Sequence, residues 1–462
     1  MAAVRLMLKA VARACARIGN DLCTALRQLI LFLGETPRPL GFVWAQLKRR
    51  EVWRSALRMM LWTVGLFMAG VVLLLLAKRR TWEACIFLVC GAWLVPLGLI
   101  CAAAVVVMGC DKTVYTMVIG LCIVGLDAQL ALDCGSGAQL ILHFYIAATA
   151  AMIAAVSYYY LCMLDPITMI SSLGTLSIAC YGILFFSPAS HGTRAWAGGL
   201  QLTEMTKLFC AICVARAATL PEVSDRSRTA AVFRTLAIHA AALIGINELS
   251  TLGVIVLCAM VILFLSLKDL RWSVVWVGIM AGAGYVVFSL CEVCAQLGGK
   301  GLLKVPAMIY RKVTTRMTGG GDGYQAARAA KALILAGWGG SEQVISVPAA
   351  KTDFALISVA QLFGVTAMLC VTFVVCALLL WGLISASRRK ADFPAILALS
   401  CLLQVVAQFI LNLVSELGGP IIGVGAPFIS LGGTNLAFSA FCVGLALAAG
   451  SGLRARESVP FR

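Results

Sequence analysis

The chain has 462 residues, of which 61% are hydrophobic and only 12% are charged, and its mean hydropathy is +0.97. Soluble globular proteins carry roughly 45–50% apolar and about 25% charged residues, so this composition excludes an ordinary soluble domain. It is typical of a chain whose helices are surrounded by a lipid bilayer.

The net charge of +17 comes from short basic clusters that lie between apolar stretches. Such a charge would suggest nucleic-acid binding in a soluble protein, but no interleaving of aromatic with basic residues supports that function here. The clusters are typical of cytoplasmic loops, where lysine and arginine meet anionic lipid headgroups. They lie at Arg13–Arg17, Lys48–Arg54, Arg226–Arg234, Arg388–Lys390 and Arg454–Arg456.

In chain order, the basic and weakly apolar residues 1–56 predict a cytoplasmic N-terminal arm, with a surface-lying helix over Leu22–Leu33. Residues 57–110 predict a transmembrane hairpin, residues 111–455 a larger membrane core, and residues 456–462 a cytoplasmic tail. Because a spanning helix needs about 20 largely apolar residues, we expect about twelve spans in an all-α membrane protein. They are expected near 57–77, 83–108, 113–132, 139–161, 166–187, 202–219, 234–248, 250–267, 272–294, 353–384, 394–415 and 431–450.

The basic clusters also predict the orientation of these spans. With the N-terminus inside, the loops at 188–200, 295–352 and 416–430 fall outside the cell. Lys78–Arg80 would then also lie outside, so this loop is either an exception or part of a hairpin that does not cross the membrane fully.

The loop at 295–352 is too long for a simple connector, and loops of this length are usually functional or disordered. It contains a glycine-rich stretch at 319–323 followed by a helical pattern over Tyr324–Leu335. We expect a partly ordered extracellular element, for which a re-entrant path remains open.

The 19 cysteines and three histidines predict no metal site. Two cysteine pairs, Cys210 with Cys213 and Cys291 with Cys294, have C-x-x-C spacing, but neither has a histidine nearby. Packing between helices is therefore favoured over zinc or redox chemistry. No cofactor is evident, and although a divalent cation is compatible with the sequence, no ligand cluster indicates one.

Ionisable side chains at membrane depth are costly, so each is a candidate functional group. Glu204 and Lys207 share one face of a predicted helix, either as a structural ion pair or with the lysine presented to a phosphate. Asp353 begins the predicted span that follows the long loop. It is a candidate general base, but from position alone an interaction with the helix macrodipole is the stronger interpretation.

Two strings of this sequence favour the catalytic interpretation of Asp353. VPAAKTDF matches a family pattern at Pro348, Thr352, Asp353 and Phe354. GGPIIGVGAPFISLGGTNL matches a second pattern at Pro420, Gly423, Pro427, Phe428, Ser430, Gly432 and Gly433. Together they resemble the signature of the shape, elongation, division and sporulation (SEDS) family, which includes FtsW, RodA and SpoVE.

The resemblance extends to further motifs. RAWAGGLQLTEMTK resembles the start of a family span at Arg194, Trp196, Gln201, Glu204 and Lys207, and Gly323–Gln325 resembles a Gly-Tyr-Gln in the family's long loop. The likeness covers about residues 113–455 as a ten-span core, with about two additional N-terminal spans before it.

Some positions depart from the family pattern. Lys351 replaces a histidine, Leu431 replaces a tyrosine, and Gln361 and Leu362 stand where two adjacent glutamates are usual. The loss of two carboxylates near the expected site is compatible with altered kinetics or with an inactive paralogue.

The resemblance implies a peptidoglycan glycosyltransferase that polymerises lipid II at the outer face of the bacterial cytoplasmic membrane, with inversion and loss of a lipid pyrophosphate. It assigns the catalytic base to Asp353. Arg194 and Lys207 would stabilise the leaving group, with Glu204 orienting Lys207. Lys351 would add positive potential, and Thr352 would contact substrate.

The turn from Ser430 through Gly432 and Gly433 is expected to offer backbone N–H groups to the substrate, or else to be a tight helix entry that needs glycine. A class B penicillin-binding protein is the implied partner. Two other functions remain open, a lipid II flippase and a non-catalytic scaffold of the division or elongation complex.

Overall fold

The structure is a computed structural model that describes residues 49–76, 84–189, 194–266, 271–298, 323–341, 343–389, 391–419 and 423–451, with a few positions between 306 and 314. The predicted helix at Leu22–Leu33, the cluster Lys78–Arg80 and the tail at 456–462 lie outside the described residues.

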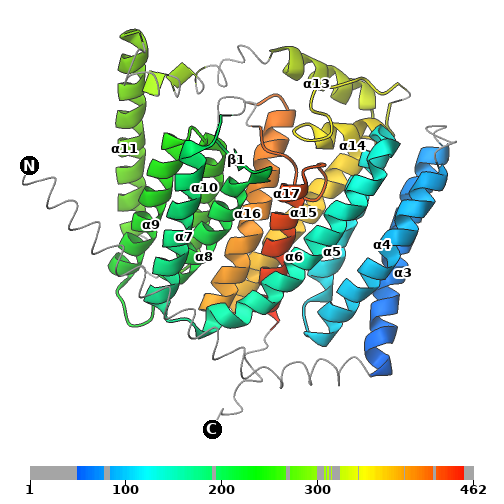
Figure 1. Cartoon of the computed structure of the whole chain (residues 1–462), viewed down its shortest axis with the longest axis horizontal. Helices are drawn as coiled ribbons and strands as arrows, with labels where there is room; N and C mark the ends of the chain where they lie inside the picture. The colour runs from blue at the N-terminus through cyan, green and yellow to red at the C-terminus, as the bar shows by residue number, and fades with distance from the viewer. Residues whose placement is uncertain are drawn as a thin grey trace, which may run out of the picture.

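The described chain is a bundle of long helices, as expected for an all-α membrane protein (Figure 1). Its first half contains α3 (Arg50–Leu76), α4 (Ala84–Val107), α5 (Lys112–Leu132), α6 (Gly137–Met163), α7 (Pro166–Phe186), α8 (Leu202–Ala218) and α9 (Asp225–Gly245). Its second half contains α10 (Leu249–Ser266), α11 (Arg271–Gln296), α13 (Gly323–Ala336), α14 (Ala355–Phe363), α15 (Val365–Arg388), α16 (Phe393–Glu416) and α17 (Gly433–Gly450). A 3₁₀ turn at Cys134–Ser136 precedes α6, and the short strands β1 (Trp196–Ala197) and β2 (Leu200–Gln201) pair antiparallel before α8.

Ten of the described helices are long and apolar enough to cross a membrane, so the chain is a multi-pass membrane protein. The expected spans at 202–219 and 234–248 are also helical, but α8 and α9 are not among these ten. α8 has 17 residues, and it packs against α7, α9, α10 and α16. Because protein surrounds α8, the charged side chains of Glu204 and Lys207 find partners inside the bundle and need not meet lipid.

Two expected boundaries are corrected by the structure. α3 begins at Arg50, so it extends into the segment predicted as the N-terminal arm. The span predicted at 353–384 is two helices, because Asp353 lies in a turn before the short α14 and the membrane-length helix begins only at Val365.

Gly364 produces the break between α14 and α15. Its backbone has φ 92° and ψ 162°, a combination essentially confined to glycine. The carbonyl of Trp338 also lies against its Cα, where a side chain would have to stand. Apolar continuity could not reveal this break, since the residues on both sides of Gly364 are hydrophobic.

We therefore expect Gly364→Ala to destabilise the protein by at least about 1–3 kcal/mol, from backbone strain and the clash with Trp338. Thermal unfolding of the detergent-solubilised protein would measure this loss. Gly174→Ala in α7, where no other atom approaches, is the control and is expected to leave stability unchanged or raised. Equal melting temperatures for Gly364→Ala and wild type would contradict the assignment.

The N-terminal pair α3 and α4 is attached to the rest of the bundle by hydrogen bonds between helices. Tyr115 Oη donates to Gly98 O (3.1 Å), Tyr145 Oη to Trp93 O (2.9 Å) and Lys112 Nζ to Ser55 Oγ (2.9 Å). Because these bonds join α5 and α6 to both helices of the pair, α3 and α4 form a fixed wall at one edge of the bundle (Figure 1).

α16 forms the centre of the bundle and is buried along most of its length, with α8, α10, α15 and α17 around it. The predicted helix over Tyr324–Leu335 is confirmed as α13, whose Arg328 donates to Ser346 O through Nε (3.1 Å) and a terminal nitrogen (2.7 Å). This contact ties α13 to the segment that leads into Asp353.

Candidate active site

Asp353 lies in a compact turn between α13 and α14. The carbonyl of Ala349, a residue with φ 54°, accepts the backbone N–H groups of Thr352 (3.0 Å) and Phe354 (3.1 Å). Phe354 is fully buried, whereas Asp353 is partly exposed. The aromatic ring therefore anchors the turn and leaves the neighbouring carboxylate at the surface of the bundle end.

The loop 423–432 lies directly beside this turn. A methyl group added at Gly423 would lie 3.9 Å from Asp353 Oδ2. Asn412 Nδ2 from α16 donates to both Asp353 O and Val424 O, each at 2.7 Å. One amide side chain thus joins the two strings that carry the family resemblance, although Asp353 and Val424 are 71 positions apart in the sequence.

A second amide repeats this arrangement from the opposite helix. Gln129 Nε2 from α5 donates to Lys351 O (3.1 Å) and Ile429 O (3.0 Å), and the backbone N–H of Leu431 donates to Lys351 O (2.8 Å). The turn that bears Asp353 is therefore held between α5 and α16.

Lys351 and Thr352 face outward beside the acid. Lys351 Nζ pairs with Asp133 Oδ2 at 2.5 Å, and both side chains are about two-fifths exposed. Thr352 is exposed, and its hydroxyl has a long contact to Ala349 O (3.4 Å). Positive potential from Lys351 is thus partly balanced by Asp133, which stands in the turn after α5.

The turn at 430–433 is a tight helix entry, the second of its two expected properties. Ser430 Oγ accepts from Asn435 Nδ2 (3.3 Å), and Gly432 is the N-cap residue of α17. A β-carbon at Gly433 would lie 2.6 Å from His143 Nε2 of α6. Gly433 is therefore required for close approach of α6. Pro420, at the start of the second string, lies outside the described residues.

Glu204 and Lys207 form a buried ion pair. Lys207 Nζ lies 2.7 Å from each carboxylate oxygen of Glu204 and donates to Gln408 Oε1 at 2.8 Å. The two charged side chains are only 7% and 6% exposed. The structure brings them together as the sequence predicts, but inside the bundle and below the turn of Asp353.

A polar chain connects this ion pair with the loop. Gln408 Nε2 donates to Asn435 Oδ1 (2.8 Å) and to Gly425 O (3.3 Å), and Asn435 Nδ2 also donates to Gly425 O (3.2 Å). Gln408 and Asn412 are one helical turn apart on α16. Gln408 links Lys207 to Gly425. Asn412 links Asp353 to the adjacent residue Val424.

Arg194 is placed differently. Its backbone N–H donates to Ile246 O (3.2 Å), while its guanidinium donates to Phe185 O at the end of α7 and lies over the Phe185 ring, 5.5 Å from the centroid. The side chain thus interacts with the C-terminus of α7, as cations do favourably. Its predicted role toward a leaving pyrophosphate stays a prediction.

Gln361, which replaces a usual glutamate, holds a loop in place. Its Oε1 accepts the N–H of Ile345 (2.7 Å), and its Nε2 donates to Ile345 O (3.3 Å). A carboxylate could accept the first bond but could not donate the second. The amide at this position therefore supports the segment before Asp353 and adds no charge to the site.

Glu416 was not predicted as a site residue. It is 3% exposed, and its carboxylate accepts the backbone N–H groups of Leu356 (3.1 Å) and Ile357 (2.6 Å) in the first turn of α14. It therefore caps α14 from another helix. The costliness of acids at membrane depth would have indicated Glu416, and the same rule extended to amides would have indicated Gln129.

Close packing beneath the loop can be tested at Gly125 of α5. A β-carbon added at this glycine would clash with Phe428 O and would lie 2.7 Å from Ile429 Cα. We expect Gly125→Ala to displace the loop, to lower stability by about 1–3 kcal/mol and to reduce activity. Gly120→Ala on the same helix, where the nearest atom is a Leu66 methyl 3.7 Å away, is the matched control. Similar melting temperatures for the two variants would argue against tight packing there.

Among the described residues, no group of three or more histidine, cysteine, aspartate or glutamate side chains is arranged to hold a metal ion. The described site contains the carboxylate of Asp353 at the end of the bundle and the buried pair of Lys207 and Glu204 beneath it. Neutral side-chain amides connect Asp353 with this pair.

These features define a polytopic membrane protein with a polar site built where loops and helix ends meet. The family model described as "Cell cycle protein", covering FtsW, RodA and SpoVE, matches residues 114–452. The chain therefore belongs to the FtsW/RodA/SpoVE family, also called SEDS, as its motifs predict.

Curated relatives carry an enzymatic name. The chain is 27% identical over 316 residues to a "Probable peptidoglycan glycosyltransferase FtsW" of Pseudomonas fluorescens (strain SBW25), covering 62% of this chain and 73% of the relative. It is 30% identical over 134 residues to a protein of the same name from Enterococcus hirae, covering 28% of this chain and 34% of that relative.

The fold is shared with a solved structure described as "Structural coordination of polymerization and crosslinking by a peptidoglycan synthase complex". The TM-score is 0.53 at 19% identity, and the match covers 75% of this chain and 98% of that one. The helical fold of the matched part of this chain is thus a known architecture.

Proposed function

We propose that this protein is a glycosyltransferase that polymerises lipid II, the undecaprenyl-pyrophosphate-linked disaccharide pentapeptide, at the outer face of the bacterial cytoplasmic membrane. Family membership and the names of the relatives support a role in peptidoglycan synthesis. The observation that carries the finer proposal is the clamped turn of Asp353, held by Asn412 and Gln129 against the loop 423–432.

In this mechanism Asp353 acts as the general base. Its carboxylate accepts the proton of the incoming sugar hydroxyl while the hydroxyl oxygen forms a bond to the anomeric carbon on the face opposite the pyrophosphate. The bond between the anomeric carbon and the pyrophosphate oxygen breaks, and the lipid pyrophosphate leaves. The fixed position of the turn supports this role, since a base must stay within hydrogen-bond reach of the proton that it removes.

Lys207 and Arg194 are the proposed cations for the leaving group, with Glu204 orienting Lys207. Lys207 donates to Gln408, which in turn donates to Gly425 of the loop beside Asp353, and this connection supports the proposed role. Lys351, Thr352, Ser430, Gly432 and Gly433 are proposed to contact substrate at the same bundle end. A class B penicillin-binding protein, which would crosslink the new strand, is the proposed partner.

Purified protein incubated with fluorescent lipid II tests the proposal, with products resolved by gel electrophoresis. We expect a ladder of glycan polymers. Translocation of lipid II across vesicles without polymer would support a flippase in its place. A protein that neither polymerises nor translocates lipid II, alone or with a transpeptidase partner, would fit a scaffold and overturn the enzymatic proposal.

A further inference from the structure

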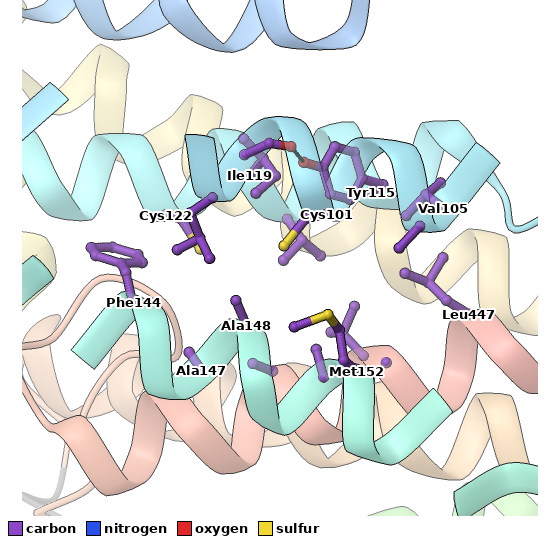
Figure 2. A pocket seen from close by; sticks show the side chains of 18 of the residues that line it. Cys101, Val105, Tyr115, Ile119, Cys122, Phe144, Ala147, Ala148, Met152 and Leu447 are labelled. Atoms are coloured by element: carbon purple, nitrogen blue, oxygen red, sulfur yellow. Dashed lines mark hydrogen bonds between the residues drawn. The ribbon is translucent and has the colours of Figure 1, made fainter. Parts of the chain in front are cut away.

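A cavity of about 200 Å³ lies between the N-terminal pair and the family core, lined by α4, α5, α6 and α17. Figure 2 shows Cys101 and Cys122 on one side of it and Ala148 and Met152 on the other. α4 comes from the segment before residue 114, where the family match begins. One wall of the cavity is therefore built by residues outside that match.

The lining of this cavity is almost entirely apolar. The two hydroxyls among the lining residues, those of Thr63 and Tyr115, already donate to the carbonyls of Met59 (3.0 Å) and Gly98 (3.1 Å). Cavities of this kind stay dry and accept apolar ligands. The surrounding helices are of membrane-spanning length, so a hydrocarbon chain is the ligand class that reaches them.

The position of the cavity favours one particular chain. One end is lined by Val105 and Leu447 near the ends of α4 and α17, and the other reaches Phe428 and Leu436. Phe428 belongs to the loop whose neighbouring residues, Val424 and Ile429, are clamped to the turn of Asp353. A chain bound there would end directly beneath the candidate active site.

We propose that this cavity binds the polyprenyl tail of the lipid-linked substrate, with the N-terminal pair α3 and α4 closing one side of the tail site. This inference rests on the proposed function, because it assigns the tail of that same substrate. A diphosphate attached to the tail would emerge beside the loop 423–432. Met152, 37% exposed, marks a side from which a chain can enter out of the bilayer.

The site is tested first on the wild-type protein in nanodiscs, with a polyprenyl pyrophosphate carrying a photoreactive diazirine in its tail. We expect labelled peptides around Cys101 of α4 and Ala148 of α6, and loss of label when unlabelled undecaprenyl pyrophosphate is added. A phospholipid carrying the same diazirine in its acyl chain is the comparison. Equal labelling by the phospholipid, or label that undecaprenyl pyrophosphate does not displace, would overturn the proposal.

A cavity-filling variant gives a second test. Ala148→Trp is expected to raise KM for lipid II roughly tenfold or more, since tail methylenes would lose their buried contacts, while a short-chain analogue reacts as with wild type. The control is Ile153→Trp on α6, at a position that is 55% exposed, and it should leave KM unchanged. An unchanged KM for Ala148→Trp would contradict the tail site.

The two proposals fail in different ways. Absence of polymer from wild-type protein, with labelling still displaced by undecaprenyl pyrophosphate, would reject the enzymatic function and keep a polyprenyl site. Polymer formation with undisplaced labelling would keep the enzyme and reject this cavity as its tail site.

Discussion

Replacing Asp353 by alanine is expected to lower the rate of lipid II polymerisation by roughly 100- to 10,000-fold, the usual contribution of a general base. The substitution removes the proton acceptor but keeps the bond from Asn412 to the turn, because Asn412 donates to the backbone carbonyl of Asp353. Asp353→Asn should be similarly impaired, since an amide cannot take up the proton. Initial rates with fluorescent lipid II would measure the loss.

The matched control is Asp165→Asn at the other end of the bundle. Asp165 caps α7 by accepting from the N–H groups of Ile167 (3.1 Å) and Thr168 (3.3 Å), a role that asparagine also fills. This variant should keep its activity, and both Asp353 variants should melt close to wild type. Polymerisation by Asp353→Ala at the wild-type rate would remove the proposed base.

The second large effect is expected from breaking the buried pair of Glu204 and Lys207. Glu204→Gln leaves the Lys207 ammonium in the bundle interior without its carboxylate, which should cost about 3–5 kcal/mol. The double variant Glu204→Gln/Lys207→Met removes both charges, and it should recover most of that stability. Thermal unfolding and yield from the membrane would record both outcomes.

The double variant also separates the two interpretations of this pair. A folded but inactive double variant would support a role of Lys207 toward the leaving pyrophosphate, and a folded and active one would mean that the pair is structural. Asp225→Asn is the control, since Asp225 and Arg228 form a partly exposed pair at 3.5 Å that should contribute about 1 kcal/mol or less. A loss of stability for Glu204→Gln no larger than that of the control would contradict the idea that burial makes this ion pair costly to break.

Apolar run lengths alone were sufficient to predict the helical membrane bundle, because a spanning helix must be long and hydrophobic wherever it meets lipid. They could not reveal the break at Gly364, which depends on a backbone conformation and on the approach of Trp338 from another segment. The predicted range 202–219 matches α8, but α8 is shorter and more polar than a lipid-exposed span because other helices surround it.

Within the candidate site, the family resemblance assigned Asp353 and the loop 423–432 to one signature, and the structure brings them together. The spacing of three residues predicted the shared face of Glu204 and Lys207. Gln129 was not predicted as a site residue because its partners, Lys351 and Ile429, are 222 and 300 residues away in the sequence. The placement of Arg194 on Phe185 could not be foreseen either, since a guanidinium near several loops has many acceptors and only the packed structure selects one.

The side-chain amides of Gln129 and Asn412 join the two motif segments, and the amides of Gln408 and Asn435 bond Gly425 of the second segment. Amides neither gain nor lose protons across the range in which enzymes work, and uncharged contacts escape ionic screening. Acidifying the medium or adding salt would therefore leave these amide hydrogen bonds in place and act on the charged contacts around them, such as the Lys351–Asp133 pair and the Glu416 cap of α14. The pH dependence of this protein should then come from its charged groups and not from the amide contacts between the two motif segments.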